Sequence, residues 1–184
     1  MSVRNVRLLC LVYFVVAVVL RFAPHGVNFN AVAALALFAG CYLTVGQGML
    51  LALGAMALTD MLGHVLDFGS MGLYHRPTML AVYASFALPS LIGWALRGRV
   101  SVRSVPTAAV ASSALFFIVT NFAAWLDPNM KFPMTPAGLL KCYVDAIPFA
   151  GNNVLGTLIF SCAFFGIHAR LSQRATATSP VRAR

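Results

Sequence analysis

The sequence predicts an all-α integral membrane protein, in which six transmembrane helices form one bundle and both termini are cytoplasmic. Three observations support this fold class. Of the 184 residues, 60% are hydrophobic and only 9% are charged, whereas a soluble domain carries roughly 25% charged residues. Apolar runs of about 20 residues, the length that spans a bilayer, recur along the chain. The basic residues stand at the ends of these runs and favour one side of the membrane.

The apolar runs divide the chain into a membrane domain over residues 1–168 and a tail over 169–184. The predicted spans are approximately 8–23, 31–43, 45–59, 78–96, 105–126 and 146–167. Pro89 predicts a kink within the fourth span, because proline removes a backbone hydrogen bond from a helix. The tail is polar and basic, and we expect it to be disordered and cytoplasmic.

Residues 31–59 could form either one long helix or two short ones. As a single helix these 29 uncharged residues would extend about 43 Å, which exceeds a bilayer core of about 30 Å. Gly46-Gln47-Gly48 is a turn signal inside the stretch. With two crossings both termini share one side, which receives nine of the 13 basic residues and no Asp. With one crossing the inner side receives only five of the 13, and the Arg-rich tail faces out. Because basic residues concentrate in the cytoplasm, two crossings are favoured.

The composition also excludes several classes of function. The net charge of +9 could suggest nucleic acid, but basic residues that flank apolar runs indicate a lipid bilayer as the partner instead. The chain contains no Walker A sequence, no G-x-S-x-G motif and no glutamate, which argues against an ATPase, an α/β-hydrolase and a glutamate-dependent zinc protease. The four cysteines lack C-x-x-C spacing and are expected to be free thiols. No cofactor is predicted.

Asp60 and His64 are the first candidate pair for a binding site. Four residues apart on a helix, they share one face. They could form hydrogen bonds at the mouth of a pocket, bind a metal, or simply mark the solvated end of the third helix. Asp67 and His75 could add metal ligands, but their spacing fits no standard signature, so no metal site is predicted.

Asn121 and Trp125 are a second candidate pair, one helical turn apart in the fifth predicted span. An aromatic ring and an amide together can stack on a flat organic ligand and hydrogen-bond to it. The alternative is that Trp125 belongs to the aromatic belt at the membrane interface.

A polar stripe marks the last predicted helix. Asn153, Thr157 and Ser161 recur every four residues and should face away from lipid. Hydrogen bonds between helices are the favoured interpretation for Thr157 and Ser161, whereas Asn152 and Asn153, close to the outer surface, are pocket candidates. Small residues at the same spacing in 36–44 predict close helix packing within the bundle or, alternatively, docking to a partner.

Several of these motifs together resemble a known family. The segment RFAPHGVNFNAVAALALFAG (21–40) is similar to a family of small bacterial membrane proteins of unknown function, described as transport proteins. A D-x-x-x-H element at Asp60 and His64, T-N-F-x-x-W over 120–125 and G-L-x-x-C-Y…I-P-F over 138–149 follow in the same order.

That family in turn resembles the substrate-binding S components of energy-coupling-factor (ECF) vitamin transporters. The resemblance implies an inner-membrane subunit for uptake of a small organic molecule, such as a vitamin or precursor. It further implies transmembrane scaffold and ATPase subunits as possible partners, and a ligand pocket near the outer face that is capped by the first loop. The expected substrate-binding residues are Asn28, Phe29, Asp60, His64, Asn121, Trp125, Tyr143 and Asn152.

Two other functions stay open on the sequence. A membrane-embedded enzyme could use Asp60 and His64 as an acid–base pair near the outer surface. A structural subunit of a membrane complex would have no ligand. In that case, its outward cavity would be filled by side chains.

Overall fold

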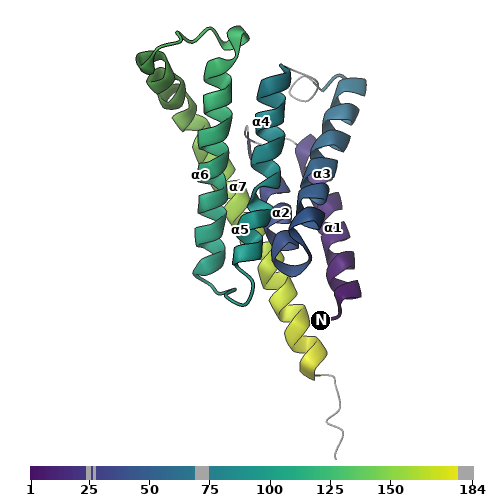
Figure 1. The fold of residues 1–184 in the computed structure, drawn as a ribbon. Coiled ribbons are helices and arrows are strands. Elements are labelled where there is room, and N and C mark those ends of the chain that lie inside the picture. The colour runs from purple at the N-terminus through teal and green to yellow at the C-terminus, as the bar shows by residue number, and fades with distance from the viewer. Residues whose placement is uncertain (24–25, 27, 69–74, 178–184) are drawn as a thin grey trace, which may run out of the picture.

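The computed structural model describes residues 1–23, 26, 28–68 and 75–177, and these residues form helices and connections with no strand. Figure 1 shows the elements arranged as an elongated bundle. They are α1 (Val3–Phe22), α2 (Val32–Tyr42), α3 (Val45–Val65), α4 (Arg76–Ala87), α5 (Pro89–Ala95), α6 (Ser104–Leu126), the short 3₁₀ helix η1 (Pro128–Met130) and α7 (Pro136–Ala177). The all-helical prediction is therefore confirmed for the described residues.

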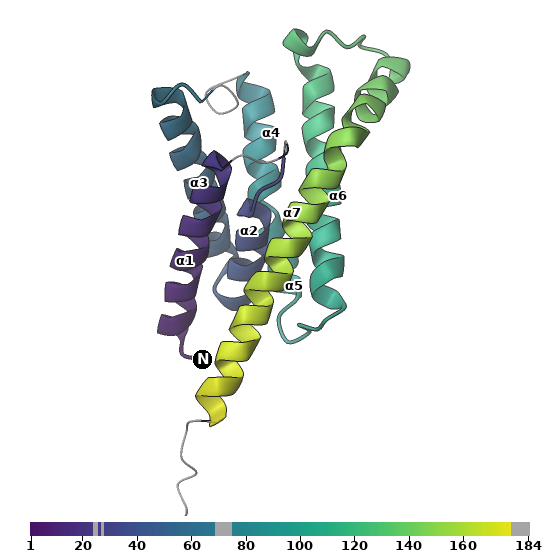
Figure 2. The same cartoon turned by 180° about the vertical axis from the view of Figure 1, so that it is seen from behind.

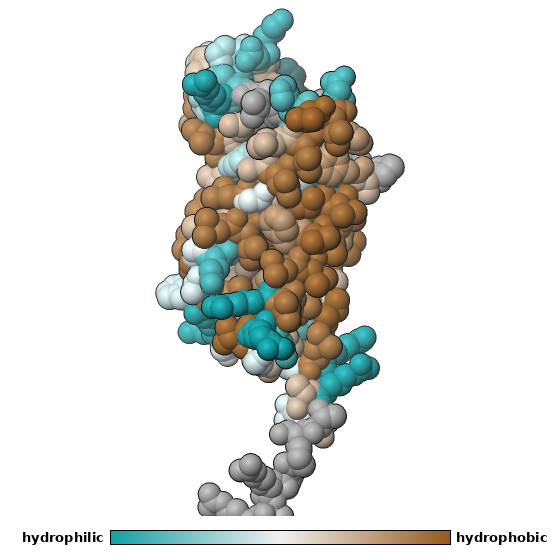
Figure 3. Space-filling model, turned by 90° about the vertical axis from the view of Figure 1, so that its right-hand side faces the viewer, coloured by the Kyte–Doolittle hydropathy of each residue, from teal (hydrophilic) through white to brown (hydrophobic). Residues whose placement is uncertain are grey.

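The helices have the length and surface of a membrane protein. Five segments are long and apolar enough to cross a membrane, namely α1, α3, α4 continued by α5, α6 and α7, while α2 is a shorter apolar helix. Large hydrophobic side chains such as Leu11, Val15 and Val19 of α1 are more than half exposed. In Figure 3 the visible face is apolar over most of its height and hydrophilic toward its two ends. Such a surface is suited to contact with lipid rather than water.

Residues 31–59 form parts of two helices, and the chain turns back between them. Leu43 and Thr44 separate α2 from α3, and the Thr44 hydroxyl accepts a hydrogen bond of 3.1 Å from the Gln47 backbone N–H. The helices touch closely, because a Cβ added to Gly48 would lie 2.9 Å from the backbone nitrogen of Gly40. Small residues thus allow α2 and α3 to pack backbone against backbone.

Helix α2 lies in the interior of the bundle. All its residues except Tyr42 are buried, and it contacts α1, α3, α5 and α7. A Cβ on Gly93 of α5 would lie 2.0 Å from the carbonyl oxygen of Leu37, so α5 also lies against the α2 backbone. The Arg97 guanidinium donates hydrogen bonds to the carbonyls of Gly40 and Leu43, which satisfies the C-terminal end of α2.

Four predicted boundaries differ from the structure by five residues or more: α1 begins at Val3 instead of 8, α3 ends at Val65 instead of 59, and both ends of α7 extend beyond 146–167. Helix α7 begins at Pro136, ten residues before the predicted start at 146. Lys141 and Asp145 form an (i, i+4) ion pair of 2.9 Å in this additional segment, which stabilises helix in a polar sequence. At the other end α7 continues to Ala177, so residues 169–177 are helical rather than disordered. Extending an existing helix requires no new nucleation. The rest of the predicted tail, 178–184, lies outside the described residues.

The charged residues separate between the two ends of the bundle. The start of α1, the α5–α6 connection and the end of α7 lie together at one end in Figures 1 and 2. This basic end carries, within the described residues, Arg4, Arg7, Arg97, Arg99, Arg103, Arg170 and Arg174. The opposite end, here called the mixed-charge end, carries Arg21, Arg76, Lys131, Lys141, Asp60, Asp67, Asp127 and Asp145.

Candidate functional site

A cavity of about 500 Å³ lies between α4, α6 and α7. It extends along α6 from Val110 to Ala124, and Met130 of η1 adds to its wall near the mixed-charge end. Its other lining residues are Asn28, Thr78, Val82, Ser113, Ala114, Phe116, Phe117, Thr120, Asn121, Ala146, Phe149, Ala150, Asn153 and Val154. Cavities of 300–1,000 Å³ with mostly apolar walls and a few polar groups are typical of small-molecule sites.

Asn153 is the most unusual polar residue of this wall. It is only 4% exposed, and its side-chain oxygen accepts no hydrogen bond from the part of the chain that the structure describes. Its backbone carbonyl accepts a weak 3.4 Å bond from the Ser113 hydroxyl, which connects α6 to α7. A buried amide oxygen without a partner costs free energy and calls for an explanation.

A hydrogen-bonded network ties α4 to the end of α6 beside the cavity. The Thr78 hydroxyl, which is part of the cavity wall, donates to a carboxylate oxygen of Asp127 at 2.8 Å. The His75 ring nitrogen Nδ1 lies 3.1 Å from the same oxygen, and the Asn129 backbone N–H donates to the other at 2.9 Å. Although burial alone would raise the pKa of the Asp127 carboxyl, these hydrogen bonds and the nearby His75 lower it below its usual range.

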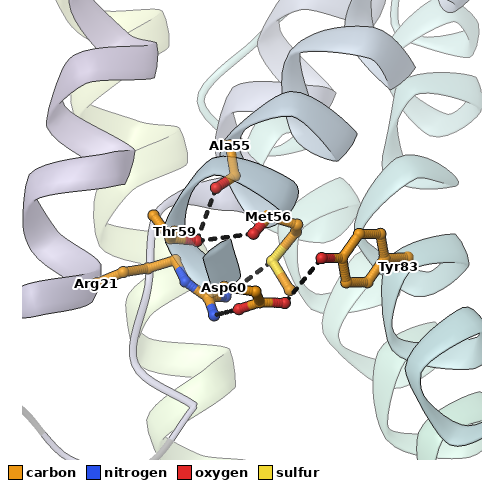
Figure 4. Close-up of polar contacts among 6 residues, drawn as sticks. All are labelled: Arg21, Ala55, Met56, Thr59, Asp60 and Tyr83. Atoms are coloured by element: carbon orange, nitrogen blue, oxygen red, sulfur yellow. Dashed lines mark hydrogen bonds and ion pairs between the residues drawn. The ribbon is translucent and has the colours of Figure 1, made fainter. Parts of the chain in front are cut away.

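Asp60 belongs to a separate and closed cluster between α1, α3 and α4. Figure 4 shows its carboxylate between Arg21 and Tyr83. One oxygen pairs with the Arg21 guanidinium at 2.6 Å, and the other accepts a 2.9 Å bond from the Tyr83 hydroxyl. The Asp60 side chain is 3% exposed and that of Arg21 is 13% exposed. The carboxylate is thus occupied by protein partners, and it does not line the cavity.

Gly26 and residues 28–31, which belong to the connection between α1 and α2, pack against α7. A Cβ on Gly26 would lie 2.6 Å from the side-chain nitrogen of Asn152, and a Cβ on Gly156 would lie 3.0 Å from the backbone nitrogen of Asn30. The Phe29 ring packs edge to face against Phe160, with centroids 5.7 Å apart. Positions 152, 156 and 160 therefore form one face of α7 that receives this loop.

Only two of the eight expected site residues line the cavity. Asn28 and Asn121 do so, Asn28 from a left-handed backbone conformation with φ of 66°. The indole N–H of Trp125 donates to the Pro133 carbonyl at 2.9 Å, and the Tyr143 hydroxyl donates to the Ile118 carbonyl at 2.8 Å. Phe29 and Asn152 take part in the loop contact, and Asp60 in the closed cluster. His64 is exposed at the end of α3. A ligand role for these six residues stays a prediction.

Thr78, Asp127 and Ser113 were not among the expected site residues. Ser113 and Asn153 both lie in long apolar runs, where a polar side chain that faces the bundle interior is itself a signal. Across the described ranges, no group of three or more His, Cys, Asp or Glu side chains could hold a metal ion. His25, a member of the expected first-loop motif, lies outside the described residues.

Comparison with known proteins identifies the family of this chain. A family model, described as a family of unknown function (DUF6580), matches residues 2–179. The chain belongs to this family. No curated protein and no solved structure matches it. The expected membership of a family of unknown function is thereby confirmed, while the further likeness to ECF S components stays a prediction.

Proposed function

We propose that this chain is a membrane transport protein that binds a small organic substrate in the cavity between α4, α6 and α7. The observation that carries this proposal is the cavity itself, because it combines a volume of about 500 Å³, apolar walls and a buried amide that lacks a partner. A bundle that served only as a structural subunit would be expected to fill such a space with side chains.

The charge distribution supports an orientation for uptake. Arginines collect at the basic end, as the positive-inside rule expects of a cytoplasmic face. In an inner (plasma) membrane, the mixed-charge end and the cavity beside Met130 would then face the exterior. Substrate would enter from outside and leave toward the cytoplasm after a conformational change.

The contacts of the first loop support a likeness to S components of ECF transporters. This loop packs on α7 through Phe29 and Phe160 and contributes Asn28 to the cavity wall. Asn28 is thus placed to contact a bound molecule from this connection. Since the sequence contains no Walker A motif, energy for release would come from separate transmembrane scaffold and ATPase subunits.

The geometry gives less support to an enzyme that uses Asp60 and His64. Both carboxylate oxygens of Asp60 are engaged by Arg21 and Tyr83, and His64 is exposed to the outside of the bundle. A general base must lie within hydrogen-bond reach of the proton that it removes, and a fully occupied carboxylate is poorly placed for this task.

Native mass spectrometry of the gently solubilised protein tests whether the cavity holds a ligand. Ala150→Trp would fill the cavity from α7, whereas Leu155→Trp adds the same side chain at a position of α7 that is 54% exposed. We expect a small molecule that co-purifies with the wild type and with Leu155→Trp and is lost from Ala150→Trp. Equal occupancy in all three proteins, or none in any, would contradict the proposal.

Cysteine labelling tests the proposed orientation. In a background without the four native cysteines, a membrane-impermeant thiol reagent should label Ala124→Cys from outside intact cells. The same reagent should reach Ser101→Cys, in the α5–α6 connection, only after permeabilisation. The reverse pattern would place the cavity toward the cytoplasm and would exclude uptake in the proposed direction.

A further inference from the structure

The described wall of the cavity carries no charged side chain. Asp127 beside it is occupied by bonds from Thr78 and Asn129, and Asp60 is paired with Arg21. A charged ligand would lose its hydration in this space without gaining a counter-charge, which is strongly unfavourable. The lining therefore favours an uncharged molecule.

Of the six side chains on this wall that carry a hydrogen-bond donor, four direct one to a protein acceptor, and Asn28 and Asn153 are the other two. The bonds run from Thr78 to the Asp127 carboxylate, from Ser113 to the Asn153 carbonyl, from Thr120 to the Phe116 carbonyl and from Asn121 to the Phe117 carbonyl. Hydroxyl and amide oxygens keep lone pairs after their hydrogens are used. Apart from the amide N–H groups of Asn28 and Asn153, these wall side chains thus present mainly hydrogen-bond acceptors to the cavity.

The Asn153 side-chain oxygen is the acceptor with the greatest need of a donor. It is buried and has no partner among the described residues, although its residue forms part of the cavity wall. This oxygen has almost no accessible surface in the structure, so the amide must rotate toward the cavity to reach a ligand. An N–H or O–H group of the ligand would then restore the hydrogen bond that the oxygen lost when the chain folded. A site built to accept a hydrogen bond discriminates strongly against molecules that lack the donor.

The remaining wall is suited to a flat apolar body. Phe116, Phe117 and Phe149 line the cavity together with valines and alanines. Aromatic rings stack on, or pack edge to face against, flat ligands.

We propose that the ligand is an uncharged, largely apolar or aromatic small molecule that donates a hydrogen bond to Asn153. This inference rests on the proposed function, since it assigns a chemical class to the occupant of the same cavity. It makes Asn153 a specificity-determining residue and explains why its side-chain oxygen has no partner among the described residues.

A binding screen with matched probes tests this inference. The probes are benzimidazole, indazole and 2-pyridone, each with its N-methylated counterpart and with a carboxylate derivative of the same ring, under mildly alkaline conditions that keep the parent rings uncharged. Binding to the protein in lipid nanodiscs is measured by equilibrium dialysis for the wild type, Asn153→Leu, Ala150→Trp and Leu155→Trp. Only binding that Ala150→Trp abolishes and Leu155→Trp preserves is attributed to the cavity.

We expect cavity binding by at least one parent ring. N-methylation should weaken it about tenfold or more, the effect of one lost hydrogen bond, and the carboxylate should weaken it about tenfold or more because its charge loses hydration without gaining a counter-charge. In Asn153→Leu the parent and its N-methyl counterpart should bind equally. Cavity binding that prefers the carboxylates, or that ignores methylation in the wild type, would overturn the assigned chemical class and leave the proposed function standing. Absence of any cavity binding by these neutral rings would also overturn the class, and with no co-purifying molecule in the wild type it would overturn the proposed function as well.

Discussion

The half of the bundle around α2 and the half formed by α4, α6 and α7 differ in how their polar groups are satisfied. In the first half Asp60 is as deeply buried as Asn153 in the second, yet both its oxygens have partners, Arg21 and Tyr83. Asn153 forms part of a cavity wall, and its buried side-chain oxygen has no partner among the described residues. The Asp60 carboxylate is fully paired inside the first half, here called the scaffold, although Arg21 Nε and Ser90 Oγ lack partners among the described residues. The Asn153 amide instead belongs to a cavity wall, where a ligand can complete it.

The largest expected effect comes from breaking the pairing in the scaffold. Asp60→Leu would leave the Arg21 guanidinium buried without its carboxylate, and we expect a loss of about 3–5 kcal/mol in the free energy of unfolding. The double variant Arg21→Met with Asp60→Leu should recover most of that loss, because no unpaired charge remains. Chemical denaturation in detergent measures both.

Asp145→Leu is the matched control, since its pair with Lys141 is exposed and is worth about 0–1 kcal/mol. If Asp60→Leu cost no more than this control, the scaffold would not depend on the buried pair.

A smaller loss of stability should follow from separating the helices that pack around α2. A Cβ on Gly40 would lie 2.1 Å from the backbone oxygen of Ser90, so Gly40→Ala forces α2 and α5 apart. We expect a loss of about 2–3 kcal/mol. Gly46→Ala meets no atom within 4 Å and should instead stabilise α3 by about 0.5–1 kcal/mol. Equal thermal unfolding temperatures for the two variants would show that α2 and α5 are not in close backbone contact at Gly40.

In the cavity half the sign of the effect should reverse. Asn153→Leu removes a buried acceptor that lacks a partner, so the ligand-free protein should gain about 1 kcal/mol in stability. Thermal unfolding of ligand-free wild type and variant gives the comparison. A loss of several kcal/mol would mean that the Asn153 amide holds the fold together rather than awaiting a ligand.

The smallest effect concerns the pH dependence of the α4–α6 link. The pKa of Asp127 is lower in the folded protein than in the unfolded chain, so protonation favours unfolding. Its contribution is complete above the ordinary carboxyl pKa of about 4 and is lost as the pH falls through the lower folded value. The melting temperature of Asp127→Asn should therefore fall less steeply at acid pH than that of the wild type. If the melting temperature of the variant fell as steeply with acid pH as that of the wild type, Asp127 would not be the cause of that fall.

The sequence predicted the helical segments well because the membrane restricts what an apolar run can do. The turn between α2 and α3 and the break at Pro89 both follow from length, charge and proline chemistry. The early start of α7 was missed because residues 136–145 are too polar to be predicted as part of a membrane span. The Lys141–Asp145 ion pair nevertheless supports a helix there.

The site was predicted less well because its contacts join residues far apart in the chain. Asn28 and Asn121 were identified, but no local pattern shows that Arg21 reaches Asp60, which leaves the latter unavailable to His64. Asn152 and Asn153 are adjacent and differ by about 100° around the helix. Only the packing of the first loop on Asn152 shows that Asn153 is the residue in the cavity wall.

Hydrogen–deuterium exchange most directly tests the division between scaffold and site. The gently purified protein is compared with the same protein stripped of small molecules by prolonged washing in detergent. We predict that stripping increases exchange in 110–124 of α6 and 146–154 of α7 and leaves α2 unchanged. Identical exchange before and after stripping, or a change concentrated in α2, would contradict the assignment of the cavity as the ligand site.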